Sequence, residues 1–166
     1  MIKKVSPIDL TDSFEKVPVK IYPDLARGSV AVAREIADLI REKQKRKSTC
    51  VLGLATGSTP KTLYAELVRM HKEEKLSFKN VVTFNLDEYY PIDNDAQQCY
   101  NRFMRSHLFD HVDINPKNIN IPNGEIKKED IKTHCIQYEK RIADAGGIDL
   151  QILGIGNNCH IGFNEP

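Results

Sequence analysis

The chain contains, at residues 50–64, the sequence CVLGLATGSTPKTLY. Its apolar half, residues 50–55, predicts a short strand that is covered on both faces, as the strands of parallel sheets are. Thr59 then suits the N-cap of a helix and Pro60 its first residue. The apolar residues of that helix follow at helical spacing: Leu63, Leu67 and Met70. This stretch therefore predicts a strand, a glycine turn and a helix in succession.

The same succession recurs on either side of this stretch. Short strands are predicted at residues 17–22, 81–86, 118–121 and 148–155, and helices at residues 28–46, 100–108 and 126–144. Strands that alternate with helices predict an α/β fold, with a doubly wound, mostly parallel sheet and helices on both faces. In such a Rossmann-like sheet, ligands bind outside the carboxyl ends of the strands.

The composition indicates a globular domain with a small-molecule ligand. The 166 residues are 40% hydrophobic and 28% charged, with a formal net charge of +1. This length makes one domain or a large part of one. The balanced charge argues against a general nucleic-acid binder, and no apolar run approaches the roughly 18 residues that a membrane span needs. The first residues also lack the apolar core of a secretory signal, so we expect a cytoplasmic protein without nucleic-acid or membrane partners.

Two features that could indicate other functions have plainer explanations. The basic run REKQKRK at residues 41–47 lies where the last turns of a helix are expected, and cations there are stabilised by the helix dipole. We expect a solvated helix face rather than a nucleic-acid patch. The four cysteines include no C-x-x-C pair, so neither a zinc knuckle nor a thioredoxin-like redox motif is predicted. They are Cys50, Cys99, Cys135 and Cys159.

Polar residues follow directly after three of the predicted strands, and we expect them to meet at one edge of the sheet. The first group consists of Thr56, Gly57, Ser58 and Thr59. It offers backbone N–H groups, hydroxyls and a helix N-terminus, which together bind a phosphate without a cation. The pattern of a Walker A loop is missing. An ordinary strand-to-helix turn uses the same residue types, so that alternative stays open.

The second group contains two adjacent carboxylates, Asp87 and Glu88, at the end of an apolar strand. Burial there raises the pKa of a carboxyl and makes it a useful general base. Adjacent residues of a strand point to opposite sides, so at most one of the two is expected to face a ligand. In the alternative interpretation, one carboxylate caps the next segment and the other is solvated.

The third group contains His160, five residues before Glu165 in a glycine-rich loop. No second histidine lies nearby at a metal-binding spacing, so no metal site is predicted. A histidine with a carboxylate within a few residues is suited to proton transfer. A structural or merely exposed histidine is the alternative.

Four segments resemble the glucosamine-6-phosphate deaminase family, also called glucosamine-6-phosphate isomerase, over about residues 50–166. They are GLATGSTPKTLY (53–64), SFKNVVTFNLDEYY (77–90), FDHVDINPKNINIPNG (109–124) and LGIGNNCHIGFNEP (153–166). The run from Val81 to Tyr89 and the ending HIGFNEP are distinctive of that family. The Gly-Ser-Thr-Pro turn is shared with the related 6-phosphogluconolactonases.

The resemblance implies conversion of glucosamine 6-phosphate and water to fructose 6-phosphate and ammonia, with neither a metal nor an organic cofactor. It implies that Asp87 is the general base that moves a proton between C2 and C1 of the sugar. His160 matches the histidine that helps to open the sugar ring, and Glu165 matches the carboxylate that orients it. Thr56, Gly57, Ser58 and Thr59 match part of the sugar-phosphate cradle.

Two residues of the third group depart from the family pattern. Asn158 and Cys159 stand where the family usually has Asp-Gly. The Asn158 amide still forms hydrogen bonds but brings no negative charge to the catalytic group, so we expect ring opening to be slower than in relatives. Cys159 can replace the glycine only if the backbone is ordinary there.

Members of this family continue well beyond the HIGFNEP motif. We therefore expect a C-terminally truncated member, with residues 1–25 as an N-terminal extension that includes a short strand. Residues 26–166 would form the N-terminal portion of a sugar-phosphate isomerase/deaminase domain. Because family members are commonly oligomers, a homo-oligomer is also expected.

Two other functions remain open from the sequence. A catalytically weak sugar-phosphate binding or regulatory module would keep the glycine-hydroxyl turn, while Asn158 and the absent C-terminal portion reduce turnover. Hydrolysis of a phosphorylated lactone fits the fold, but not the residues 85–89 or the ending NEP.

Overall fold

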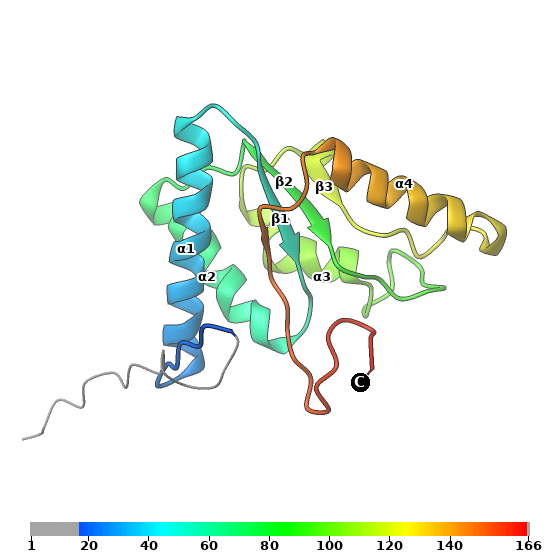
Figure 1. Cartoon of the computed structure of the whole chain (residues 1–166), viewed down its shortest axis with the longest axis horizontal. Coiled ribbons are helices and arrows are strands. Elements are labelled where there is room, and N and C mark those ends of the chain that lie inside the picture. Colours follow the sequence, from blue (N-terminus) through cyan, green and yellow to red (C-terminus); the bar gives the residue numbers. More distant parts are fainter. Residues whose placement is uncertain (1–16, 166) are drawn as a thin grey trace, which may run out of the picture.

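The computed structural model describes residues 17–165 of the chain. Its α-helices are α1 (Leu25–Lys45), α2 (Ser58–Glu74), α3 (Tyr100–His107) and α4 (Ile131–Asp144), and its 3-10 helices are η2 (Phe109–His111), η3 (Pro116–Asn118) and η4 (Lys128–Asp130). Its strands are β1 (Cys50–Leu54), β2 (Val81–Asn85), β3 (Ile119–Asn120) and β4 (Leu150–Gln151). These strands form a parallel sheet in the order β3-β2-β1-β4 (Figure 1). None of the helices in residues 17–165 is long and apolar enough to cross a membrane.

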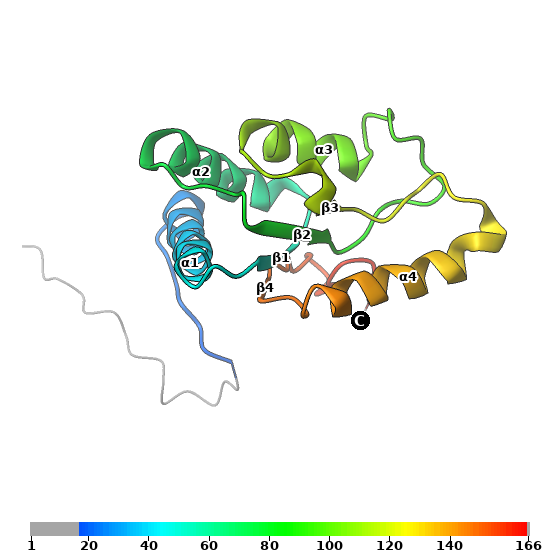
Figure 2. The same cartoon turned by 90° about the horizontal axis from the view of Figure 1, so that it is seen from above.

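Helices cover both faces of this sheet, as the sequence predicted. Cys50, Leu52 and Leu54 of β1 point into the larger core, which they share with α1, α2 and α3. Val51 points to the opposite face, where it packs with Phe84 of β2 and Tyr138 of α4. Figure 2 shows α2 and α3 on one side of the sheet and α4 on the other. The α/β, doubly wound fold class is therefore confirmed.

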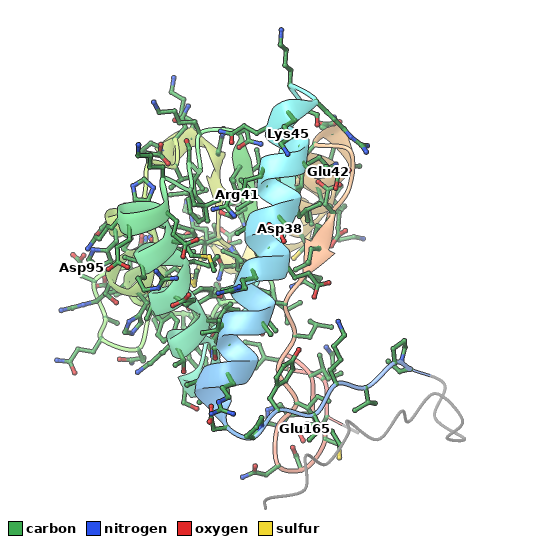
Figure 3. The ribbon with its side chains drawn as sticks, turned by 90° about the vertical axis from the view of Figure 1, so that its left-hand side faces the viewer. Asp38, Arg41, Glu42, Lys45, Asp95 and Glu165 are labelled. Carbon is green, nitrogen blue, oxygen red and sulfur yellow. The ribbon has the colours of Figure 1, made fainter. Side chains whose placement is uncertain are left out.

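Asp24 is the N-cap of helix α1, and its carboxylate accepts a hydrogen bond from the Arg27 N–H at 2.8 Å. Four of the five apolar residues that lie at helical spacing in this segment are fully buried: Ala33, Ile36, Ala37 and Ile40. The fifth, Val32, is 39% exposed, so the buried stripe is narrower than the spacing predicted. Asp38, Arg41, Glu42 and Lys45 lie along its outer side (Figure 3). Arg41 lies 3.6 Å from Asp38 and 3.7 Å from Glu74, and Arg46 lies 2.5 Å from Glu42. These cations have carboxylate partners within the chain, which supports a solvated helix face.

Two predicted strands differ from the structure at the ends of the described chain. Residues 17–22 form no strand in the described structure, and Val17 and Ile21 are 70% and 78% exposed. Pro18 removes one backbone donor from this segment, and the described structure supplies no neighbouring strand to pair with it. The other residues of the predicted N-terminal extension before residue 17 lie outside the described part.

The predicted strand at residues 148–155 is shorter than expected. Only Leu150–Gln151 forms β4, and the last bond between this segment and β1 runs from the Ile152 N–H to the Gly53 carbonyl, at 2.9 Å. β1 ends one residue after Gly53, so residues 153–155 have no backbone partner in the sheet. A Cβ atom at Gly53 would lie 1.9 Å from the end of the Gln151 side chain, so the terminal amide of Gln151 occupies the space that Gly53 leaves beside β1.

Two tyrosines hold the carboxyl ends of the strands in place. The hydroxyl of Tyr64, on α2, donates a hydrogen bond to the carbonyl of Ala55, directly after β1, at 2.5 Å. The hydroxyl of Tyr138, on α4, contacts the carbonyls of Asn85 and Asn120 at 2.8 and 3.0 Å, at the ends of β2 and β3. The loops that follow β1 and β2 therefore start from fixed positions.

Candidate active site

The first two groups of polar residues follow β1 and β2 closely, as predicted from the sequence, whereas the third lies further beyond β4, which ends at Gln151. Because these strands are parallel, their carboxyl ends lie at the same edge of the sheet. Figure 1 shows the C-terminal loop beyond that edge, on the side toward which β1 and β2 point. Figure 3 labels Glu165 on this loop, at the same end of the molecule as the N-terminus of α1.

The glycine turn after β1 leads into α2 earlier than the sequence predicted. Gly57, not Thr59, is the N-cap residue, and Pro60 is the third residue of the helix rather than the first. The reason is the backbone of Gly57, whose φ of +122° turns the chain at once and is costly for any other residue. No side chain caps the helix, so its first N–H groups have no such partner. Together with the exposed Ser58 and Thr59 they form a suitable anion site.

Asp87 is half-buried at the end of β2. Burial raises the pKa of its carboxyl, and the neighbouring charge of Glu88 raises it further. Among the residues that the structure describes, none donates a hydrogen bond to this carboxylate. A carboxylate with a raised pKa and free oxygen atoms can accept a proton from a bound molecule and return it.

Glu88 has a structural role at the N-terminus of α3. Its carboxylate accepts hydrogen bonds from the N–H groups of Tyr100 and Asn101, at 2.9 and 3.1 Å, and from the Cys99 thiol at 3.3 Å. The alternative in which one of the two carboxylates caps the next segment is therefore correct for Glu88. The other part of that alternative is wrong, because Asp87 is half-buried rather than solvated.

The C-terminal loop brings Asn158, His160 and Glu165 together. The Nδ1 atom of His160 contacts the Oδ1 atom of Asn158, which also accepts from the His160 backbone N–H at 3.3 Å. The Nδ2 atom of Asn158 donates to the Glu165 carboxylate at 2.5 Å. Glu165 therefore reaches His160 through the Asn158 amide.

Cys159 does not have the ordinary backbone conformation that a replacement of glycine would require. Its φ is +69°, in the left-handed region that favours glycine. The cysteine side chain is exposed and lies in a tight turn, in which the Cys159 N–H donates to the Gly156 carbonyl at 2.9 Å. This residue is accommodated at a cost in backbone energy.

One aromatic residue at this edge has no signal in the sequence. Tyr100 is the first residue of α3, and its ring lies 4.9 Å from that of Tyr89 between centroids. Burial raises the pKa of the Tyr100 hydroxyl, and the nearby charge of Asp87 raises it further. Tyr100 thus packs against Tyr89, two residues after Asp87. Its position on a helical stripe indicated only a core residue.

The sequence profile of a family described as glucosamine-6-phosphate isomerases/6-phosphogluconolactonase matches residues 23–162 of the chain. The chain belongs to this family. A glucosamine-6-phosphate deaminase of Thermoanaerobacter sp. (strain X514) is 49% identical to the chain over 135 residues. That alignment covers 81% of the chain and 53% of the relative.

Solved structures of the same family have the same fold. A monomeric glucosamine-6-phosphate deaminase superposes with a TM-score of 0.80 and 43% identity, over 86% of this chain and 57% of that one. The 6-phosphogluconolactonase of Thermotoga maritima superposes with a TM-score of 0.68 and 27% identity, over 82% of this chain and 60% of that one. This family member therefore spans a little over half the length of these relatives.

Proposed function

We propose that this chain binds glucosamine 6-phosphate and converts it, with water, to fructose 6-phosphate and ammonia. The observation that carries the proposal is the placement of Asp87. It is a half-buried carboxylate with a raised pKa, one strand away from an uncapped helix N-terminus that suits a phosphate. The relatives named glucosamine-6-phosphate deaminase support this substrate over other sugar phosphates.

In the proposed reaction, the phosphate is held by the turn after β1. The N–H groups at the start of α2 and the hydroxyls of Thr56, Ser58 and Thr59 would contact its oxygen atoms, with Gly57 allowing close approach of the backbone. This binding places the other end of the sugar toward Asp87. The helix N-terminus is suited to the negative charge of the phosphate.

Asp87 would act as the general base of the isomerisation. Its carboxylate takes the proton from C2 of the opened sugar and delivers it to C1. Because burial and the charge of Glu88 raise its pKa, Asp87 holds a proton more readily than an exposed aspartate does, which suits a reversible transfer. Water then replaces the amino group at C2, which leaves as ammonia.

His160 would assist the opening of the sugar ring. The Oδ1 atom of Asn158 can only accept a hydrogen bond, so the contact with it assigns the hydrogen of His160 to Nδ1. This tautomer leaves Nε2 free to exchange a proton with the ring oxygen and O1 of the sugar. Glu165 fixes the orientation of the Asn158 amide through its Nδ2 atom. The three residues therefore form an ordered chain of contacts.

A sugar-phosphate binding module with little turnover is a second candidate. It is favoured by the Asn158 amide, which places a neutral group next to His160, where a charged one would stabilise the imidazolium form. In this candidate the glycine turn keeps its role and Asp87 has none.

Ammonia release from glucosamine 6-phosphate separates these candidates. We expect release by the chain and none above background by the Asp87→Asn variant, which keeps the size of the side chain. Calorimetric binding of fructose 6-phosphate by both proteins controls for loss of the site. Binding without release would support the module, and hydrolysis of 6-phosphogluconolactone instead would support the lactonase activity of the other relatives.

The Asn158→Asp variant tests the role of the neutral amide. If the missing charge slows ring opening, this variant releases ammonia faster than the parent chain. An unchanged rate would show that a charge at residue 158 is dispensable. Homo-oligomer formation and a cytoplasmic location remain predictions, and size-exclusion chromatography with light scattering tests the former.

A further inference from the structure

Three aromatic rings from separate segments pack together beside Asp87. Tyr89 belongs to the loop after β2, Tyr100 begins α3, and Phe163 belongs to the C-terminal loop. The ring centroids lie 4.9 Å apart for Tyr89 and Tyr100, 5.4 Å for Tyr89 and Phe163, and 6.4 Å for Tyr100 and Phe163. The planes of Tyr100 and Phe163 are 15° apart, so these rings are stacked. We call these three residues the aromatic trio.

Phe163 adjoins the residue that covers Asp87. Ile161 and Asn164 form two backbone hydrogen bonds with each other, at 3.1 and 3.3 Å, and this closes a tight turn. Gly162 lies in that turn with a φ of +62°. A Cβ atom at Gly162 would lie 3.3 Å from Oδ2 of Asp87, so the glycine backbone is close to the carboxylate. Phe163 follows Gly162 directly in this turn, so its ring is anchored next to the backbone that approaches Asp87.

The contacts that hold the C-terminal loop on the rest of the protein are few. Among the described residues, every hydrogen bond of residues 156–165 joins two members of that segment. Leu153 and Ile155, which precede the segment, are 50% and 74% exposed. The loop is ordered internally by hydrogen bonds, but the aromatic contacts of Phe163 and the approach of Gly162 seat it on the body of the protein.

We propose that Phe163 is a positioning residue, whose ring, packed against Tyr89 and Tyr100, holds Gly162 over Asp87 and keeps His160 at the same edge of the sheet. The inference rests on the proposed function for its catalytic meaning, since Phe163 acts through Asp87 and His160 and transfers no proton itself. The aromatic trio thus joins the loop after β2, the start of α3 and the C-terminal loop.

Loss of the Phe163 ring has a specific electrostatic consequence. The charged and titratable groups that act on or respond to Asp87 are Glu88 of the same loop, Tyr100 of α3 and Tyr138 of α4. None of them is a cation. Burial is therefore the main reason for the raised pKa of Asp87, and a loosened loop admits water to the carboxylate. The pKa of Asp87 then falls toward its ordinary value.

The test compares Phe163→Ala with two controls. Phe163→Tyr keeps the ring, and Ile161→Ala removes apolar surface from the same turn without touching the aromatic trio. The pKa of Asp87 is measured by NMR titration of its carboxyl carbon in the full chain, without substrate. We expect Phe163→Ala to lower this pKa, and both controls to leave it at the value of the parent chain.

The kinetic arm uses ammonia release from glucosamine 6-phosphate. We expect Phe163→Ala to lower kcat about tenfold or more with little change in KM, and to move the acidic limb of the pH profile to lower pH. An unchanged Asp87 pKa in Phe163→Ala, or an equal change in Ile161→Ala, overturns the inference. If the parent chain releases no ammonia, the proposed function fails, while the titration still decides whether Phe163 controls the environment of Asp87.

Discussion

The hydroxyl of Tyr138 offers a direct test of how the carboxyl ends of the strands are held. Tyr138 is only 8% exposed, and its hydroxyl contacts the backbone carbonyls of Asn85 and Asn120 at 2.8 and 3.0 Å. The Tyr138→Phe substitution removes this hydroxyl and keeps the ring, which packs edge-on against Phe84 at 5.7 Å. The two carbonyls then lose a donor while the apolar packing remains.

The size of the effect follows from these two contacts. A buried hydrogen bond contributes about 1 kcal/mol net, and an acceptor left without a partner costs a similar amount or more. We therefore expect the free energy of unfolding to fall by about 2 kcal/mol. For a chain of this size, such a loss lowers the melting temperature by about 4–8 °C.

Urea denaturation followed by circular dichroism measures this change, with Tyr90→Phe as the matched control. The hydroxyl of Tyr90 donates a hydrogen bond to the Ile126 carbonyl at 3.1 Å, but the residue is 45% exposed. Its loss should change the free energy of unfolding by less than about 0.5 kcal/mol. If Tyr138→Phe is no more destabilising than this control, the hydroxyl of Tyr138 does not hold the strand ends.

Three further predictions concern the loops of the site. The Asp87→Asn variant should be more stable than the parent chain at neutral pH, because the raised pKa of Asp87 means that its charge destabilises the folded state there. This advantage should vanish in acid, below the ordinary pKa of a carboxyl. Urea denaturation at a series of pH values measures the difference, and a difference that stays constant with pH would contradict the prediction. Glu88→Gln should lower the pKa of Asp87, because the charge that raises it is lost; NMR titration measures this effect, and an unchanged Asp87 pKa would refute it. The same substitution should destabilise the start of α3 by about 1 kcal/mol, which urea denaturation measures. Cys159→Gly should stabilise the C-terminal loop by up to about 1 kcal/mol, because the φ of +69° no longer involves a side chain; slower amide hydrogen exchange at residues 159 and 164 is expected, and unchanged exchange would count against backbone strain at Cys159.

Local patterns predicted the elements that build the sheet. A continuous apolar run predicted β1, a largely apolar segment predicted β2, and helical spacing predicted most of the buried stripe of α1, because these patterns follow from which face of a segment is covered. The N-cap of α2 was predicted wrongly at Thr59. The general preference for threonine was overridden by the backbone of Gly57, which turns the chain two residues earlier.

The failure at residues 17–22 has a different cause. Alternating apolar residues make a strand only where a neighbouring strand supplies backbone partners, and the sequence does not show whether such a neighbour exists. The described structure supplies none for this segment.

The candidate site was predictable where a functional side chain follows its strand directly. Asp87 and the glycine turn are of this kind. The separate roles of Asp87 and Glu88 were left open, because the choice depends on where the N-terminus of α3 lies. The packing of Tyr100 against Phe163 could not be predicted from the sequence, although Phe163 lies within the HIGFNEP motif, since it arises only when segments more than sixty residues apart in the chain come together.

The two faces of the sheet are packed unequally in the described part of the chain, with eighteen buried residues in the core beneath α1, α2 and α3 and three in the core beneath α4. Hydrophobic burial resists local opening, so α4 is the helix expected to detach most easily from the sheet. The hydroxyl of Tyr138 leaves with it, and the end of β2 is then released. Detachment of α4 would in this way displace Asp87, which follows β2, although α4 itself carries none of the proposed catalytic groups.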